Sequence, residues 1–157
     1  MKIALLQTGK TTEQYIVSGV DTYSQRIKRY TAFEIITIPA IRNNRNMPLV
    51  EQKDKEGKKI IESAGKNDYI VLLDEAGAQM NTSEFAGWLE RQMMYQTRRI
   101  LFVIGGPWGF SGDVYKISDM KLSLSKMTFS HQMVRLLFAE QLYRAFTIIK
   151  GEPYHHD

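Results

Sequence analysis

A glycine-rich loop follows a strongly apolar run in the last third of the chain. Ile100 to Ile104 is typical of a buried strand, and Gly105 to Gly109 then reads Gly-Gly-Pro-Trp-Gly. Glycine lacks a Cβ and tolerates positive φ, so such a loop lets a ligand approach the backbone closely. Its spacing matches neither G-x-G-x-x-G nor the P-loop, which excludes those two nucleotide fingerprints. The loop is either one wall of a ligand site or a turn that only reverses the chain.

Two groups of titratable side chains follow this loop. His131 and Arg135 are four residues apart in an otherwise apolar segment, so they share one face of a predicted helix. Tyr154 and His155 lie near the end of the sequence. Each group also has an interpretation without a chemical role. His131 would then be a hydrogen-bonded histidine near a helix start, and Tyr154 and His155 would belong to a solvated tail. No Asp or Glu stands at ligand spacing from the histidines, so we predict no metal site.

The elements that would position these residues alternate between strands and helices. Strands are predicted at 3–6, 33–38, 69–73 and 100–104, and helices at 16–30, 49–64, from about 81, around 114–120 and from 131 to 149. Asn81 with Glu84 predicts a capping box, Asp74 to Gly77 a turn, and Arg42 to Pro48 a loop. This order predicts an α/β fold with a largely parallel sheet flanked by helices.

Ligands of open α/β sheets bind where the carboxyl ends of the strands diverge. Three predicted loops lie at such ends: 73–77, 105–110 and 124–129. The long helix that follows them is apolar around most of its circumference, from Met133 to Phe146. It is either central to the monomer or covered by a partner, and we favour the partner, which predicts a homodimer.

Composition limits the classes of function. The 157 residues, 43% of them hydrophobic, predict one domain over 1–157. The formal net charge of +4 permits a nucleic-acid partner, and Arg42 to Lys59 contains six basic and three acidic residues, which favours either an RNA-contacting surface or a solvated helix face. The absence of cysteine excludes disulfides and thiol nucleophiles. No apolar run reaches membrane-spanning length, and no signal peptide is evident, so we expect a cytoplasmic protein with no membrane partner.

Five motifs in fixed order resemble a known family along essentially the whole chain. The sequence closely resembles the ribosomal large-subunit methyltransferase H family of the SPOUT superfamily. The motifs are Ile104-Gly105-Gly106-Pro107-x-Gly109, Leu124-Ser125-Lys126-Met127-Thr128, His131-Gln132-Met133-Val134-Arg135, Glu140-Gln141-Leu142-Tyr143-Arg144-Ala145 and Pro153-Tyr154-His155. Two positions depart from the family pattern: Ser130 replaces a frequent proline, and His156-Asp157 replaces a frequent basic end.

The resemblance implies a fold and an activity. It implies a C-terminal trefoil knot, a homodimer, and methylation of N3 of a pseudouridine in 23S large-subunit rRNA within assembled ribosomes, at the subunit interface. S-adenosyl-L-methionine would be the cofactor, without a separate RNA-binding domain. By position, the cofactor-binding residues would be Leu73, Gly105, Leu124, Ser125, Lys126, Met127, Thr128 and Phe129.

The resemblance also assigns roles to the titratable residues. The N3 proton must leave, and the candidate acceptors are His131, His155 or solvent positioned by Tyr154. Arg135 would stabilise developing negative charge or bind phosphate, and Glu140 would orient Arg135 or the tail. The sequence leaves four points open. They are the identity of the general base, the exact nucleotide that is modified, whether one or both subunits build each active site, and whether residues 42–59 contact RNA.

Two other functions compete with the enzyme. A non-catalytic ribosome- or RNA-binding protein on the same fold would not bind the cofactor tightly, so calorimetry separates it. A Rossmann-like enzyme for a small metabolite is disfavoured by the basic region and by the missing acidic ribose-binding residue.

Overall fold

The fold is a five-stranded parallel sheet covered by helices on both faces. The computed structural model describes residues 1–42, 46–95 and 98–156. The strands are β1 (Lys2–Thr8), β2 (Ala32–Ile38), β3 (Asp68–Gln79), β4 (Arg99–Ile104) and β5 (Met120–Ser123), in the order β2-β1-β4-β3-β5. The helices are α1 (Gln14–Ile27), α2 (Leu49–Ser63), α3 (Thr82–Met94), α4 (Gly112–Ile117) and α5 (His131–Ile149). The predicted α/β class with a parallel sheet is confirmed, and the knot stays a prediction.

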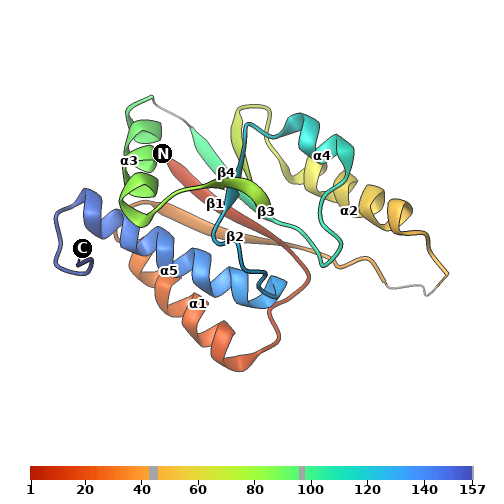
Figure 1. The fold of residues 1–157 in the computed structure, drawn as a ribbon, viewed down its shortest axis with the longest axis horizontal. Coiled ribbons are helices and arrows are strands. Elements are labelled where there is room, and N and C mark those ends of the chain that lie inside the picture. The colour runs from red at the N-terminus through yellow and green to blue at the C-terminus, as the bar shows by residue number, and fades with distance from the viewer. Residues whose placement is uncertain (43–45, 96–97, 157) are drawn as a thin grey trace.

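The alternation of side chains along the central strands produces two apolar cores. Ile3, Leu5 and Phe102 face α1, α3 and α5, whereas Leu6 and Val103 face α2 and α4. All of these side chains are fully buried. Figure 1 shows α5 running beside α1 on one side of the sheet and α2 beside α4 on the other. The strands are therefore buried on both faces, as continuous apolar runs predict.

The long apolar helix is central to its own layer. α5 contacts α1 on one side and α3 on the other, and it buries Phe138, Leu142 and Phe146 completely. Gly19 of α1 allows this close packing, because a Cβ there would lie 2.6 Å from Cδ1 of Leu136. Much of the apolar circumference is thus explained within one chain. Met133, Leu136 and Leu137 remain half-buried.

Two sequence predictions near β5 were wrong. Asp74 to Gly77 does not end the third strand: β3 continues to Gln79, and Ala78 and Gln79 pair with Leu122 and Ser123 after an irregularity in register. Gly77 permits this approach, since a Cβ there would lie 2.7 Å from the backbone nitrogen of Leu122. The helix predicted around 114–120 ends at Ile117, and Met120 begins a strand instead.

The polar residue before β5 explains that second difference. The carboxylate of Asp119 accepts a hydrogen bond from the backbone N–H of Ile70 at 2.7 Å, and its own N–H donates to the Ile70 carbonyl at 2.9 Å. These bonds attach the chain to β3 before another helical turn forms. The capping box of Asn81 and Glu84 is confirmed. Of the predicted loop at 42–48, residues 43–45 lie outside the described residues. Among the described residues, no helix is long and apolar enough to cross a membrane.

We predict that Phe138→Ala lowers the free energy of unfolding by about 3–5 kcal/mol, because it leaves a cavity where α5 meets β4. The Phe138 ring lies 4.6 Å from that of Phe102, centroid to centroid. Urea denaturation followed by circular dichroism measures the change. Met94→Ala, at a side chain that is 71% exposed, is the control and should change the free energy by less than about 0.5 kcal/mol. Equal losses for the two variants would contradict this assignment of the core.

Candidate functional site

A cavity of about 450 Å³ opens at the carboxyl ends of β4 and β5, beside Leu73 to Glu75 of β3. The register places Leu73 opposite both Ile104 and Leu122, so the segments that follow these residues converge on one place. The predicted cofactor residues fall on this cavity with one exception, Lys126. Its walls include Leu73, Gly105, Leu124, Ser125, Met127, Thr128 and Phe129.

The glycine-rich loop forms one wall of the cavity. Gly105 packs against the ring of Phe110, since a Cβ on Gly105 would lie 3.0 Å from Cε1 of Phe110. Gly109 has a φ of +80°, a conformation that favours glycine. Trp108 extends from the tip of the loop, lines the cavity and is 51% exposed. The loop therefore presents backbone and one aromatic ring to the cavity, which argues against a turn that only reverses the chain.

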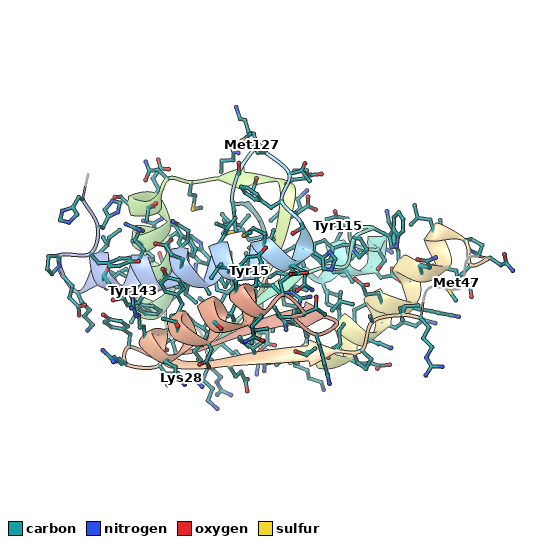
Figure 2. The ribbon with its side chains drawn as sticks, turned by 90° about the horizontal axis from the view of Figure 1, so that it is seen from below. Tyr15, Lys28, Met47, Tyr115, Met127 and Tyr143 are labelled. Carbon is teal, nitrogen blue, oxygen red and sulfur yellow. The ribbon has the colours of Figure 1, made fainter. Side chains whose placement is uncertain are left out.

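The opposite wall is held by hydrogen bonds between loops. The hydroxyl of Thr128 donates to Glu75 at 2.8 Å, and the N–H of Met127 donates to Oγ of Ser125 at 2.9 Å. The hydroxyl of Tyr115 donates to Asp74, and burial followed by this bond raises the pKa of Tyr115 to about 12. Figure 2 shows Tyr115 on α4 and Met127 projecting outward from the loop before α5. Sequence reasoning missed Tyr115, whose only signal was an aromatic residue in a short helix.

His131 lines the cavity at the first residue of α5. Ser130 caps this helix, since its hydroxyl accepts from the N–H of Met133 at 3.2 Å, as its position before the helix suggests. Burial, and next the cation of Arg135, hold the pKa of His131 below its ordinary value of 6.5, while the Glu56 carboxylate opposes the shift. The imidazole is therefore mostly neutral at pH 7 and is able to accept a proton.

Arg135 lies in the interior rather than on the cavity wall. Its side chain is 1% exposed, and its guanidinium donates to the carbonyl of Thr8 at 2.8 Å and to the hydroxyl of Thr11 at 2.9 Å. These bonds fix the segment that follows β1. Burial lowers the pKa of Arg135 from its ordinary value. The structure thus brings Arg135 next to His131, where its charge acts on the imidazole.

Tyr154 and His155 lie at the other end of α5. Tyr154 packs against Tyr143, with ring centroids 4.8 Å apart, and the Arg144 guanidinium lies 4.6 Å above its ring. Glu140 pairs with Arg144 at 2.5 Å, and the Tyr154 hydroxyl donates to Glu140 at 3.4 Å. Burial, followed by the Tyr23 hydroxyl 3.4 Å away, raises the pKa of Tyr154 to about 12. Glu140 therefore orients the tail and Arg144, not Arg135.

The two predicted groups of titratable residues do not meet within one chain. α5 has 19 residues, and at a rise of about 1.5 Å per residue its two ends are separated by about 27 Å. Figure 2 places Tyr143 in the C-terminal half of this helix, near the tail. His131 lines the cavity at the helix start, whereas Tyr154 folds back against Glu140 and Tyr143, and neither Tyr154 nor His155 lines the cavity.

The basic stretch at 42–59 divides between solvent and the cavity. Lys55 forms an exposed ion pair with Glu51 at 3.0 Å, which is typical of a solvated helix face. Lys53 lines the cavity. Glu56, one of the three acidic residues, is buried, so the outward face of α2 is more positive than its sequence indicates. Among the described residues, no group of three or more His, Asp or Glu is placed to hold a metal ion.

Comparison with known proteins gives full-length matches. The family model described as "Predicted SPOUT methyltransferase" matches residues 1–155. Proteins named ribosomal RNA large subunit methyltransferase H are 48% identical in Bacteroides thetaiotaomicron, over 100% of both chains, and 49% identical in Christiangramia forsetii, over 99% of both.

Solved structures share the fold at low sequence identity. The tRNA (m1G37) methyltransferase from Aquifex aeolicus aligns with a TM-score of 0.58 at 17% identity, over 100% of this chain and 76% of that one. A methyltransferase-like protein from Legionella pneumophila, solved with bound SAM, aligns with a TM-score of 0.50 at 14% identity, over 92% and 66%.

We predict that NMR titration of the His131 imidazole gives a pKa below 6.5, because burial and Arg135 both disfavour its cation. Arg135→Met should raise that pKa, since it removes the neighbouring positive charge. A spectrum of His131→Asn assigns the resonance against those of His155 and His156. A wild-type pKa at or above 6.5, or no rise in the Arg135 variant, would contradict the arrangement described.

Proposed function

Because the chain belongs to the SPOUT methyltransferase family, and within it to the ribosomal RNA large subunit methyltransferase H group, we propose that it methylates large-subunit rRNA with S-adenosyl-L-methionine. The observation that carries the proposal is the cavity at the ends of β4 and β5, beside Leu73 of β3 and walled by a glycine-rich loop. The finer target is N3 of a pseudouridine in 23S rRNA. A ribosomal substrate would place the protein in the cytoplasm.

The cavity fits a cofactor of this size and chemistry. A volume of about 450 Å³ lies within the usual range for small-molecule sites, and the backbone at Gly105 and Gly106 is bare of Cβ atoms. Leu73 and Leu124 supply apolar surface, and Ser125 and Thr128 supply polar groups. We assign Leu73, Gly105 and 124–129 to cofactor binding, with Lys126 at the rim. When bound, the cofactor supplies a methyl group already activated by its positive sulfur.

The residues of the chain then have to orient the base and remove its N3 proton. His131 is the acceptor that the cavity itself offers, because it lines the wall and is mostly neutral at pH 7. Arg135 is a positioning residue in this scheme. It acts through His131, whose proton affinity its charge lowers, and through the β1–α1 segment that it fixes. Orientation of the reacting groups carries much of the remaining barrier.

A homodimer would bring the tail to the cavity. Tyr154 contacts Glu140, nine residues after His131 and about 14 Å from it along the helix axis, and neither Tyr154 nor His155 lines the cavity of its own chain. Two copies that pack in opposite directions would place the tail of one beside the cavity of the other. Half-buried Leu137 on α5 and exposed Tyr15 and Val17 on α1 supply apolar surface for such contact. The active site would then be built by both subunits.

A chain that forms one domain, as we propose, also has limited means of holding RNA. With no separate RNA-binding domain proposed in residues 1–157, the dimer itself must grip its substrate, helped by the shape of the assembled ribosome. Lys53 at the cavity, Lys126 at its rim and the outward face of α2 supply basic groups close to the site. The alternative of a non-catalytic binding protein has no comparable support from the cavity.

We predict that methyl transfer to assembled large subunits is at least about tenfold faster than transfer to the same rRNA freed of protein, because a protein proposed to lack a separate RNA-binding domain, with a formal net charge of only +4, holds naked RNA weakly. Incorporation of labelled methyl groups, with mass spectrometry of the rRNA to identify the base, measures both rates. Heat-denatured enzyme is the control. Equal rates on both substrates would refute recognition of ribosome shape, and no transfer to either would refute the proposed function.

We predict that two inactive variants complement each other. Gly106→Val disables the cavity, since no side chain fits there, and Tyr154→Phe with His155→Ala disables the tail. Random mixing of subunits makes half of the dimers mixed, with one intact site each, so roughly a quarter of the wild-type rate should return. Single-turnover assays after unfolding and remixing measure it. No recovery would mean that each site uses its own tail, and a fully active tail variant would rule out a catalytic tail.

A further inference from the structure

A buried carboxylate lies directly behind the glycine wall of the cavity. Glu56 of α2 is 9% exposed, and its Oε1 accepts a hydrogen bond from the backbone N–H of Gly106 at 2.7 Å. A Cβ on Gly106 would lie 2.6 Å from Oε2, so the carboxylate touches the back of the loop. Gly106 therefore contacts this carboxylate and also lines the cavity.

The helix that carries Glu56 is held tightly against this loop. A Cβ on the next residue, Gly57, would lie 2.3 Å from Oγ of Ser111. Ser111 caps α4, immediately after the loop, with its hydroxyl accepting from Val114. α2 therefore touches the loop near its start, at Gly106, and just beyond its end, at Ser111. This packing keeps the carboxylate from swinging away from the cavity.

The charge of Glu56 has no partner cation within the part of the chain that the structure describes. None of the ion pairs in residues 1–42, 46–95 and 98–156 includes it. Its electrostatic influence reaches His131, but burial and Arg135 favour the neutral imidazole. A buried carboxylate with one backbone hydrogen bond is costly to retain. A positive ligand in the adjacent cavity would offset that cost.

We propose that Glu56 makes the cavity selective for the positively charged methyl donor over the neutral thioether left after transfer. This inference rests on the proposed function. The donor carries a sulfonium, and loss of the methyl group leaves sulfur without charge. Attraction between Glu56 and the charged sulfur strengthens binding of the donor. The product lacks that charge, so it is bound more weakly and is released more readily. Glu56 acts through the loop, so it is a positioning and selectivity residue rather than a catalytic one.

The two acidic residues on the cavity itself are less suited to this task. Glu75 is exposed and accepts from Thr128, so water screens its charge. Asp74 accepts hydrogen bonds from the Tyr115 hydroxyl and from the N–H of Ala76 at 2.9 Å. Glu56 is the more deeply buried, and charges interact more strongly where water is excluded.

The test is calorimetry with three ligands that differ in charge at one position. The ligands are S-adenosylmethionine, S-adenosylhomocysteine, whose sulfur is neutral, and sinefungin, in which a carbon bearing a protonated amine replaces the methyl-bearing sulfur. Glu56→Gln keeps an oxygen that accepts from Gly106 and removes the charge. It should raise the dissociation constants of both cationic ligands by about tenfold and change that of the neutral one by less than about twofold.

Asp54→Asn is the matched control, because it removes the same charge from the exposed face of the same helix. It should leave all three constants within about twofold. Glu56→Ala also removes the hydrogen bond to Gly106, so every ligand should weaken, while the ratio of neutral to cationic affinity shifts as in Glu56→Gln. That ratio tests the proposal even if Glu56→Gln does not fold.

A parallel loss for all three ligands in the Glu56 variants would overturn the proposal, because it is the result of loop positioning alone. Unchanged constants in Glu56→Gln would overturn it as well. Failure of wild-type protein to bind any of the three ligands would instead overturn the proposed function. Thermal melting of each variant without ligand separates these results from loss of folding.

Discussion

The register in which β3 pairs with β4 and β5 is the constraint on which the site depends. Leu73 stands opposite Ile104 on one side and Leu122 on the other, so the three following segments begin at one level of the sheet. A shift of one residue would turn buried side chains of these strands toward the other face. The two apolar cores hold the register, because fully buried Val71 and Leu72 belong to different cores although they are neighbours in sequence.

Burial and two buried charges of opposite sign set the pKa of His131. Burial lowers this pKa most, Arg135 lowers it further, and Glu56 opposes both. Both charged groups are bonded to backbone that shapes the site: Arg135 to the carbonyl of Thr8 at the end of β1, and Glu56 to the N–H of Gly106. Arg135 and Glu56 therefore each hold a backbone segment in place and also change the pKa of His131. Substitutions that preserve the hydrogen bond but remove the charge are needed to separate these two effects.

Periodicity and local chemistry predicted most elements because they are local signals. The capping box of Asn81 and Glu84 and the continuous helix 131–149 required no distant contact. The extension of β3 past Gly77 could not be predicted in this way, because it depends on pairing with β5, more than 40 residues later. Glu56 was hidden for the same reason: in sequence it is one charge among many on α2, and only its contact with Gly106 marks it. The convergence of the 105–110 and 124–129 loops was predictable, since parallel strands end at one edge, whereas the predicted loop at 73–77 is part of β3.

The contacts that hold the tail against α5 favour an assembly of two chains if the tail is to act at the cavity. Ser130 caps the start of this 19-residue helix, and the Glu140–Arg144 pair with the ring of Tyr143 holds Tyr154 against its C-terminal half. Bringing Tyr154 to His131 within one chain would require breaking those contacts and moving the tail by about 14 Å along the helix, the axial distance from Glu140 to His131. A second copy needs neither change, because contact between like surfaces of two chains in opposite directions exchanges the two ends. The ordered tail is thus a reason to expect a shared site.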